Sequence, residues 1–379
     1  MPHSASLLKA GKKNSSTSPE KSASIKTGDT PMDDSSADTS VPGGASSPPQ
    51  SCVPVGGVDF QALVHSTQEE TLRAVVSSLP TIGLQATQIG RARQLVQDIL
   101  HHRSPEDRVF LAYTSNMISC GLRDTFAYLA RERLVDCFIS SAGGIEEDVI
   151  KCGGSTLLGQ FSLDGRALRR RGINRIGNLL VPNDNYCWFE DFFTPVLASV
   201  HETQRVSRWK TLTTPSEIIE AMGAAMEKKN PDTCTSSLLY WCYRNRIPVF
   251  SPAFTDGSMG DMIYFYNFSH KGLVVNPLED VVRLRKQSAT AGGRNLAIVL
   301  GGGLPKHHLL RNVSMDAVVM VTTGLEADGC VSSGVLADDV ACGLLREDAE
   351  VVRVQGDATV VFPLMLIEER GQHVEEGGS

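Results

Sequence analysis

The chain has 379 residues, 41% of them hydrophobic and 21% charged, which is ordinary for a globular protein large enough to bury a sizeable core. Its formal net charge of −7 and the absence of a prominent basic run disfavour nucleic acid as a partner, because a phosphate backbone needs clustered Lys and Arg. Residues 1–30 lack the apolar core of a signal peptide, and no apolar run approaches the roughly 18–20 residues that span a bilayer. We therefore expect a cytoplasmic protein without a membrane partner.

The first 50 residues differ in composition from the rest of the chain. They hold 12 Ser, 4 Thr, 6 Pro and no aromatic residue. Such a segment cannot bury enough apolar surface to offset the entropy lost on ordering. The sequence therefore predicts a disordered Ser/Thr/Pro-rich tail over residues 1–50, a single domain over 51–370 and a flexible C-terminus over 371–379.

Helical stretches and short apolar runs then follow one another. Apolar residues at three- and four-residue spacing predict helices over 67–79 and 86–100, and a further helix that ends near residue 133. Continuously apolar runs are typical of parallel strands that are buried on both faces. Six such runs cover residues 109–113, 135–140, 247–250, 296–300, 318–321 and 351–354. We predict an α/β, Rossmann-like, doubly wound and mostly parallel sheet with helices on both faces, and a ligand crevice at the carboxyl ends of its strands.

Three segments that follow these runs could carry chemistry. The acidic triplet 146–148 lies at a predicted helix start, where it either complements the helix dipole or binds ribose hydroxyls or an amine. Residues 255–261 form either an Asx-rich turn or a ribose or polyamine site. The Gly-rich turn at 300–308 is neither a dinucleotide fingerprint nor a phosphate loop, and we expect its two histidines to be structural, without a metal. These residues alone indicate a nucleotide- or amine-binding α/β protein.

Long stretches of the chain resemble deoxyhypusine synthase. The resemblance runs from about residue 58 to residue 368. It rests on GLQATQIGRA (83–92), AYTSNMIS (112–119), SAGGIEEDVIKC (141–152), INRIGNLLVPNDNYCWFED (173–191), IPVFSPAFTDGSMGDMI (247–263), LGGGLPKHH (300–308), LEADG (325–329) and GDATVVFPLM (356–365). The family uses NAD to dehydrogenate spermidine and passes the aminobutyl group through an imine on an enzyme lysine. It delivers that group to one lysine of the precursor of eukaryotic translation initiation factor five A. Family members are tetramers with cofactor and active sites at dimer interfaces.

The resemblance implies two sets of site residues. Those that match cofactor-binding positions are Ser115, Asn116, Met117, Ile118, Ser119, Ser141, Ala142, Gly143, Glu147, Asp256, Gly302, Thr323, Gly324, Asp328, Asp357 and Ala358. Those that match amine-binding positions, as a vestigial site or one that a partner completes, are Glu146, Glu147, Asp261, His307 and Asp338.

The segment that should carry the chemistry departs from the family pattern. The family reads approximately DGSDSGARPDEAVSWGK, whereas residues 328–344 read DGCVSSGVLADDVACGL without a gap. Leu344 replaces the lysine that forms the imine, Cys342 replaces a tryptophan that packs on spermidine, and Val331 replaces an amine-binding aspartate. Leucine has no amine and cannot form an imine. Losing the carboxylate removes a charge-assisted hydrogen bond of roughly 1.5–3 kcal/mol.

The resemblance therefore implies a chain with no catalytic residue of its own. It is closest in kind to the inactive, regulatory members of the family in kinetoplastids. We expect it to bind NAD and to activate a catalytic paralogue in a heterotetramer. The complex would modify the initiation-factor precursor, and spermidine would bind this chain weakly or only in a shared site. Two alternatives stay open: an NAD-dependent amine dehydrogenase without aminobutyl transfer, and a structural or NAD-sensing protein.

Overall fold

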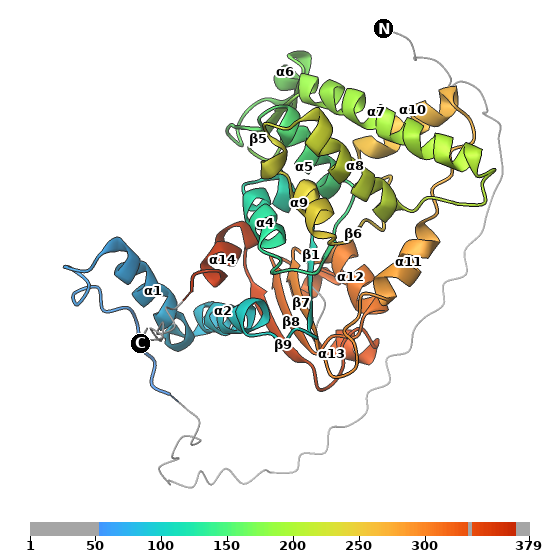
Figure 1. Ribbon diagram of the computed structural model, residues 1–379. Helices are drawn as coiled ribbons and strands as arrows, with labels where there is room; N and C mark the ends of the chain where they lie inside the picture. The colour runs from blue at the N-terminus through green and yellow to red at the C-terminus, as the bar shows by residue number, and fades with distance from the viewer. Residues whose placement is uncertain (1–52, 333–335, 369–379) are drawn as a thin grey trace, which may run out of the picture. The chain divides into compact units, whose positions relative to one another are not determined.

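The computed structural model describes residues 53–332 and 336–368 (Figure 1). The tail predicted over residues 1–50 and the C-terminus predicted over 371–379 lie outside the described residues. Within these ranges no helix is both long and apolar enough to cross a membrane.

A six-stranded parallel sheet forms the centre of the fold. Its strands are β1 (Arg108–Tyr113), β2 (Cys137–Ile139), β6 (Val249–Phe250), β7 (Asn295–Leu300), β8 (Ala317–Thr322) and β9 (Glu350–Gln355). They lie in the order β6-β2-β1-β7-β8-β9, which is the 3-2-1-4-5-6 order of doubly wound dinucleotide-binding sheets. All six predicted strands are confirmed. The run over 247–250 gives only two strand residues, because Pro248 accepts a hydrogen bond from the backbone N–H of Phe138 but has no N–H of its own to donate.

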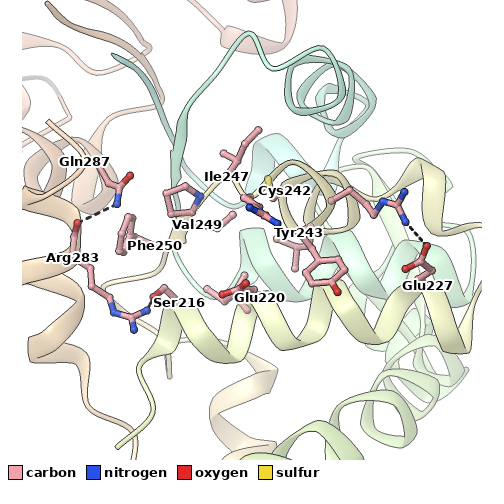
Figure 2. A pocket seen from close by; sticks show the side chains of 15 residues that line it. Ser216, Glu220, Glu227, Cys242, Tyr243, Ile247, Val249, Phe250, Arg283 and Gln287 are labelled. Carbon is pink, nitrogen blue, oxygen red and sulfur yellow. Dashed lines mark hydrogen bonds and ion pairs between the residues drawn. The ribbon is translucent and has the colours of Figure 1, made fainter. Parts of the chain in front are cut away.

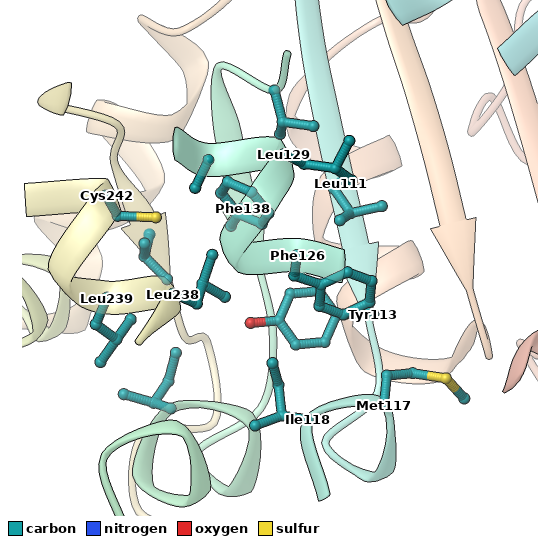
Figure 3. Close-up of a cluster of buried hydrophobic side chains, with 14 of the residues drawn as sticks. Leu111, Tyr113, Met117, Ile118, Phe126, Leu129, Phe138, Leu238, Leu239 and Cys242 are labelled. Carbon is teal, nitrogen blue, oxygen red and sulfur yellow. The ribbon is translucent and has the colours of Figure 1, made fainter. Parts of the chain in front are cut away.

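Alternate residues of each central strand point into two separate cores. Val109, Leu111 and Tyr113 of β1 belong to one apolar cluster, whereas Phe110 and Ala112 belong to the other. In the first cluster the ring of Tyr113 packs on Phe126 with 4.7 Å between centroids (Figure 3). The helices that contribute to this first face include α2 (Leu84–His101), α4 (Leu122–Arg131), α5 (Gly143–Gly153) and α14 (Ala358–Met365). The second face is covered by α11 (Pro277–Arg285), α12 (Gly303–Asn312) and α13 (Leu336–Ala341). Helices on both faces confirm the predicted doubly wound architecture.

The remaining elements pack around this unit. They are α1 (Gln68–Ile82), α3 (Asn116–Ser119), α6 (Gly165–Arg170), α7 (Asn183–Val206), α8 (Pro215–Lys229), α9 (Leu238–Asn245), α10 (Ser258–Ser269) and the short 3-10 helices η1 (Cys234–Ser236) and η2 (Glu326–Asp328). A second, antiparallel sheet has the order β3-β5-β4, with β3 (Leu157–Leu158), β4 (Ile173–Ile176) and β5 (Leu179–Pro182). Sequence periodicity did not predict this small sheet.

Several helices start at local capping signals. Thr67 and Glu70 form a reciprocal capping box at the start of α1, and Thr214 and Glu217 do the same for α8. Each box satisfies backbone N–H groups that have no partner inside the helix. At α11, Asn276 accepts from a backbone N–H, and the proline that follows it suits the first helical position. Short-range chemistry therefore fixes where these helices begin.

Candidate functional site

A crevice opens at the carboxyl ends of the central strands. It has a volume of about 250 Å³ and lies beside the β1–β7 junction, where the strand order reverses and doubly wound proteins bind ligands. Its lining comes from the loops after four strands: Thr114, Asn116, Met117, Gly301, Val321, Thr322, Thr323, Gly356, Asp357 and Ala358. Five of the predicted cofactor residues, Asn116, Met117, Thr323, Asp357 and Ala358, therefore line one cavity.

The Gly-rich turn after β7 requires glycine at two positions. Gly301 and Gly302 have φ angles of 87° and 76°, a region that residues with a Cβ rarely adopt. A Cβ on Gly301 would lie 2.4 Å from Oγ1 of Thr114, and one on Gly302 would lie 2.8 Å from Cα of Ser332. The side chain of Thr114 and the backbone of Ser332 thus approach the turn closely, and Gly301 forms part of the crevice wall.

The loops after β1 and β2 meet beside this crevice. The backbone N–H of Ala142 donates to Oδ1 of Asp256 at 2.9 Å. A Cβ added to Gly143 would lie 3.0 Å from Cβ of Ser115. The structure therefore brings Ser115, Ala142, Gly143 and Asp256 together, as the predicted site requires.

The first acid of the triplet caps a neighbouring helix. The carboxylate of Glu146 accepts from the backbone N–H groups of Ser258 and Met259 at 3.1 and 2.8 Å, which fixes the start of α10. Burial raises the pKa of Glu146, and the charges of Asp256 and Asp261 add to that effect. Glu146 therefore lies close to Asp256 and Asp261, two other acids of the predicted site. Its own oxygens already accept hydrogen bonds from the backbone of α10.

The second acid, Glu147, has a carboxylate oxygen that is free to accept a hydrogen bond from a ligand. Glu147 is 8% exposed. Oε2 of Glu147 is buried without a hydrogen-bond partner in the described part of the chain. Burial raises the pKa of Glu147 to about 6, with the charge of Glu146 contributing. Burial likewise raises the pKa of Tyr186 to about 12, helped by the charges of Glu147 and Glu146. An unpaired buried carboxylate oxygen fits a hydroxyl or ammonium donor of a ligand.

The third acid is structural. Asp148 is fully buried and accepts from Nε of Arg123 at 2.7 Å and from Oγ of Ser237 at 2.6 Å. It also accepts from the backbone N–H groups of Leu238 and Leu239 at 3.0 and 2.9 Å. This carboxylate joins α4, α5 and the start of α9, so the triplet divides into a cap, a candidate ligand group and a structural anchor.

Other predicted positions have local partners. Asp357 caps α14 through the backbone N–H of Thr359 at 2.8 Å, and Asp328 accepts from the backbone N–H of Leu325 at 2.8 Å. Gly324 accepts from Arg353 through its carbonyl. Ile118 is completely buried in the apolar core, so its side chain faces away from any ligand in the crevice.

The remaining predicted positions are Ser141, which is partly buried and follows β2, and the acids Asp261 and Asp338, which are both exposed. His307 has a buried Nδ1 without a partner among the described residues. Burial lowers the pKa of the adjacent His308. Within the described ranges, no three His, Cys, Asp or Glu side chains are grouped as a metal site.

A buried ion pair, which the sequence did not reveal, ties the divergent segment to the Gly-rich turn. Nζ of Lys306 on α12 lies 2.7 Å from Oδ2 of Asp339 on α13, and their side chains are 2% and 7% exposed. Lys306 also donates to the carbonyl of Val331 at 3.1 Å. The only local sign that Lys306 is important is that it directly precedes the predicted site residue His307. Its acidic partner, Asp339, lies 33 residues further along the chain.

Leu344, which the resemblance places at the position of the family's lysine, packs in the second apolar core. It is 7% exposed, and its backbone N–H donates to the carbonyl of Asp339 at 2.8 Å. Cys342 and Val331 are exposed. Residues 333–335 of the same segment lie outside the described ranges. Position 344 thus belongs to the apolar packing of α13 against the sheet.

A larger cavity lies beside the edge strand β6. Its volume is about 640 Å³, and its lining comes from α8, α9, α11 and β6 (Figure 2). It includes the ion pair between Arg244 and Glu227, at 2.7 Å, and the side chains of Arg283 and Gln287. None of the predicted site residues lines this cavity, so we place the candidate site at the smaller crevice.

Comparisons with known proteins identify a family for the chain. A sequence profile described as deoxyhypusine synthase matches residues 74–368. The chain belongs to the deoxyhypusine synthase family. It is 85% identical, over 94% of both chains, to a Leishmania donovani protein named inactive deoxyhypusine synthase. It is 60% identical to the deoxyhypusine synthase regulatory subunit of Trypanosoma brucei brucei, over 83% of this chain and 92% of that one.

The fold comparison gives the same family. A crystal structure of a deoxyhypusine synthase-family protein from Entamoeba histolytica aligns with a TM-score of 0.57 and 26% identity. The alignment covers 82% of this chain and 95% of that one. The family resemblance inferred from the sequence motifs is therefore confirmed.

Proposed function

We propose that this chain is a catalytically inactive deoxyhypusine synthase subunit that binds NAD and activates a catalytic paralogue in a heterotetramer. One observation carries the proposal. Leu344 occupies the position of the imine-forming lysine and lies 7% exposed in an apolar core. A leucine side chain cannot form an imine. The names of two close relatives, inactive deoxyhypusine synthase and regulatory subunit, support a role beside an active enzyme.

Three features at this end of the sheet support NAD binding. The crevice lies at the strand-order reversal, and the Gly301–Gly302 turn beside it permits close backbone approach. Glu147 does not line the crevice itself, but its Oε2 is buried without a hydrogen-bond partner among the described residues. A ribose hydroxyl that donates to Glu147 would satisfy that oxygen. Asn116, Met117 and the loop after β9 would hold the rest of the cofactor. When bound, NAD supplies a hydride acceptor, whereas this chain's residues contribute binding only.

The proposed partners follow from the family. The catalytic paralogue supplies the lysine, and the complex acts in the cytoplasm on the precursor of eukaryotic translation initiation factor five A. Spermidine binds to this chain weakly or only in a site shared with the partner. Val331, which replaces a carboxylate, lowers the affinity of this half of the site for an ammonium.

The test compares the purified chain alone, the catalytic paralogue alone and the two mixed. NADH formation and transfer of the aminobutyl group are measured separately. We expect no activity from this chain alone and strong stimulation of the paralogue on mixing. Spermidine-dependent NADH release by this chain alone would replace the proposal with an amine dehydrogenase. Failure to associate with the paralogue would favour a structural or NAD-sensing protein.

The proposed binding of NAD is tested by calorimetric titration of NAD into the isolated chain. Glu147→Gln, which removes a charged acceptor, should weaken binding about tenfold, a change of about 1.4 kcal/mol. Glu190→Gln on the exposed surface of α7 is the matched control and should bind like the parent chain. Equal affinity of both variants would exclude Glu147 from the cofactor site.

A further inference from the structure

The segment 155–182, here called the basic arm, is unlike the rest of the chain in charge. It comprises β3, α6, β4 and β5 and contains five Arg, one Asp and neither Lys nor Glu. The chain as a whole has a net charge of −7. The one acid, Asp164, caps α6 by accepting from the backbone N–H groups of Arg166 and Ala167 at 2.7 and 3.3 Å. The expectation that no basic run is prominent is therefore wrong for this arm.

Four of the five arginines on the arm are exposed and unpaired. Arg175 is the exception, since it donates to the carbonyls of Phe161 and Leu163 and so holds the arm together. The others form no ion pair within the described ranges, and they are Arg166, Arg169, Arg170 and Arg171. Some exposed arginines elsewhere in the chain do pair, as Arg205 does with Glu202 at 2.8 Å. The arm thus presents cations that have no acidic partner in the described part of the chain.

Exposed apolar side chains accompany these cations. Leu158 is 80% exposed and Phe161 is 75% exposed. The ring of Phe161 lies against Gly177, where an added Cβ would meet it at 3.4 Å. Exposed aromatic and aliphatic side chains beside arginines are typical of protein-binding surfaces.

The exposed arginines and apolar side chains together favour an acidic polypeptide over a nucleic acid as the ligand of the arm. The unpaired cations lie on and directly after a helix of six residues, which is only about 9 Å long. A nucleic acid needs a longer basic stripe than this short helix can offer. An acidic protein segment with an apolar residue matches both halves of the surface.

The arm also lies near the candidate site. Figure 1 shows α6 next to the start of α7, beyond α5 as seen from the six-stranded sheet. Leu158 and Leu179 of the arm line a cavity of about 310 Å³ together with Ser119 and Lys151. Ser119 is one of the predicted cofactor positions, and it is near enough to Glu147 to counteract the effect of burial on the pKa of that carboxyl group. A macromolecule that binds the arm is therefore positioned close to that site.

We infer that the basic arm is a docking surface for an acidic segment of the protein substrate that the catalytic partner modifies. The inference rests on the proposed function, because it requires a complex that acts on a protein. Arginines 166, 169, 170 and 171 supply the charge complementarity, and Leu158 with Phe161 supplies the apolar contact. The arm thereby contributes substrate recognition to a complex whose chemistry lies in the other subunit.

The experiment uses the full-length chain in complex with its catalytic paralogue. Arg169→Glu/Arg170→Glu is compared with Arg91→Glu/Arg311→Glu, which makes the same charge change at exposed positions away from the arm. We expect the first variant to raise the KM for the protein substrate about tenfold at low salt. The kcat and the KM for spermidine should stay within twofold. The difference should shrink at about 0.5 M salt, because exposed charges are screened.

A second variant tests the exposed apolar side chains of the arm. Leu158→Ser/Phe161→Ser should also raise the KM for the protein substrate, but without the salt dependence. Both side chains are exposed, so the fold should tolerate the change. An unchanged KM in both arm variants, with stimulation of the paralogue intact, would overturn the docking surface and leave the proposed function standing.

Two other results would also overturn it. If Arg169→Glu/Arg170→Glu prevents assembly in sedimentation, the arm binds the partner subunit. If a short single-stranded RNA binds the parent complex more tightly than a Glu- and Leu-containing peptide of equal charge, the arm binds nucleic acid. Absence of stimulation by the parent chain itself would instead refute the proposed function.

Discussion

Removing the carboxylate of Asp339 should destabilise the chain far more than its position on a short helix suggests. Its Oδ2 lies 2.7 Å from Nζ of Lys306, and the two side chains are 7% and 2% exposed. Asp339→Ala leaves an uncompensated buried ammonium, which typically costs about 3–5 kcal/mol. With a urea m-value of about 3 kcal/mol per molar, the midpoint of unfolding should fall by about 1 M or more. The measurement is equilibrium urea denaturation followed by circular dichroism.

The neighbouring residue supplies the control. Asp338 belongs to the same helix, is exposed and has no ion pair in the described part of the chain, so Asp338→Ala should change the free energy of unfolding by about 0.5 kcal/mol or less. The double variant Lys306→Met/Asp339→Leu removes both charges and should lie within about 1–2 kcal/mol of the parent. An Asp339→Ala variant as stable as Asp338→Ala would refute the reasoning, since it would mean that the pair is not buried in solution.

Three further predictions concern single residues. Leu344→Lys should not restore aminobutyl transfer, assayed on the chain alone, and should destabilise it by several kcal/mol in urea, because it places an ammonium in an apolar core. Asp148→Ala should cost about 3–5 kcal/mol, measured by thermal unfolding, because it unpairs the buried Arg123. Because the pKa of Glu147 is raised to about 6, its protonated form is favoured by folding. Its stabilising contribution is present below about pH 4.5 and is lost as the pH rises through 6, so Glu147→Gln should flatten a decline of about 2 kcal/mol in that window, measured by urea unfolding at each pH.

The large sheet was predictable because its strands carry a strong local signal. Runs such as VFLAY at 109–113 are buried on both faces, and the structure extends that strand by only one residue, to Arg108. The small sheet was not predictable from periodicity, because β3 has two residues and both are exposed. Short strands with exposed side chains give no alternation to detect. The family motif marked residues 173–191 as important without indicating that two strands lie there.

The candidate site was predictable where backbone conformation determines it. The glycines at 301 and 302 and the small residues at 141–143 follow strands, so the sequence alone placed them at one sheet edge. What the sequence could not provide were side-chain partners distant along the chain. The pair between Lys306 and Asp339 and the cap that Glu146 provides for α10 both depend on tertiary packing.

The difference between features set by the backbone and features set by single side chains explains how this chain can lose the family's chemistry and keep the form of its site. The crevice is built from strand ends and from the loops that follow them, including the glycine turn at 301, so we expect substitutions elsewhere to leave it in place. The resemblance implies that Leu344 stands where the family has its imine-forming lysine, and the leucine side chain contributes to the second core. Position 344 is held by apolar packing and by the backbone of Asp339, so we predict that a lysine there would not become a nucleophile that faces the crevice. The loss of catalysis therefore includes a change in packing as well as in chemistry.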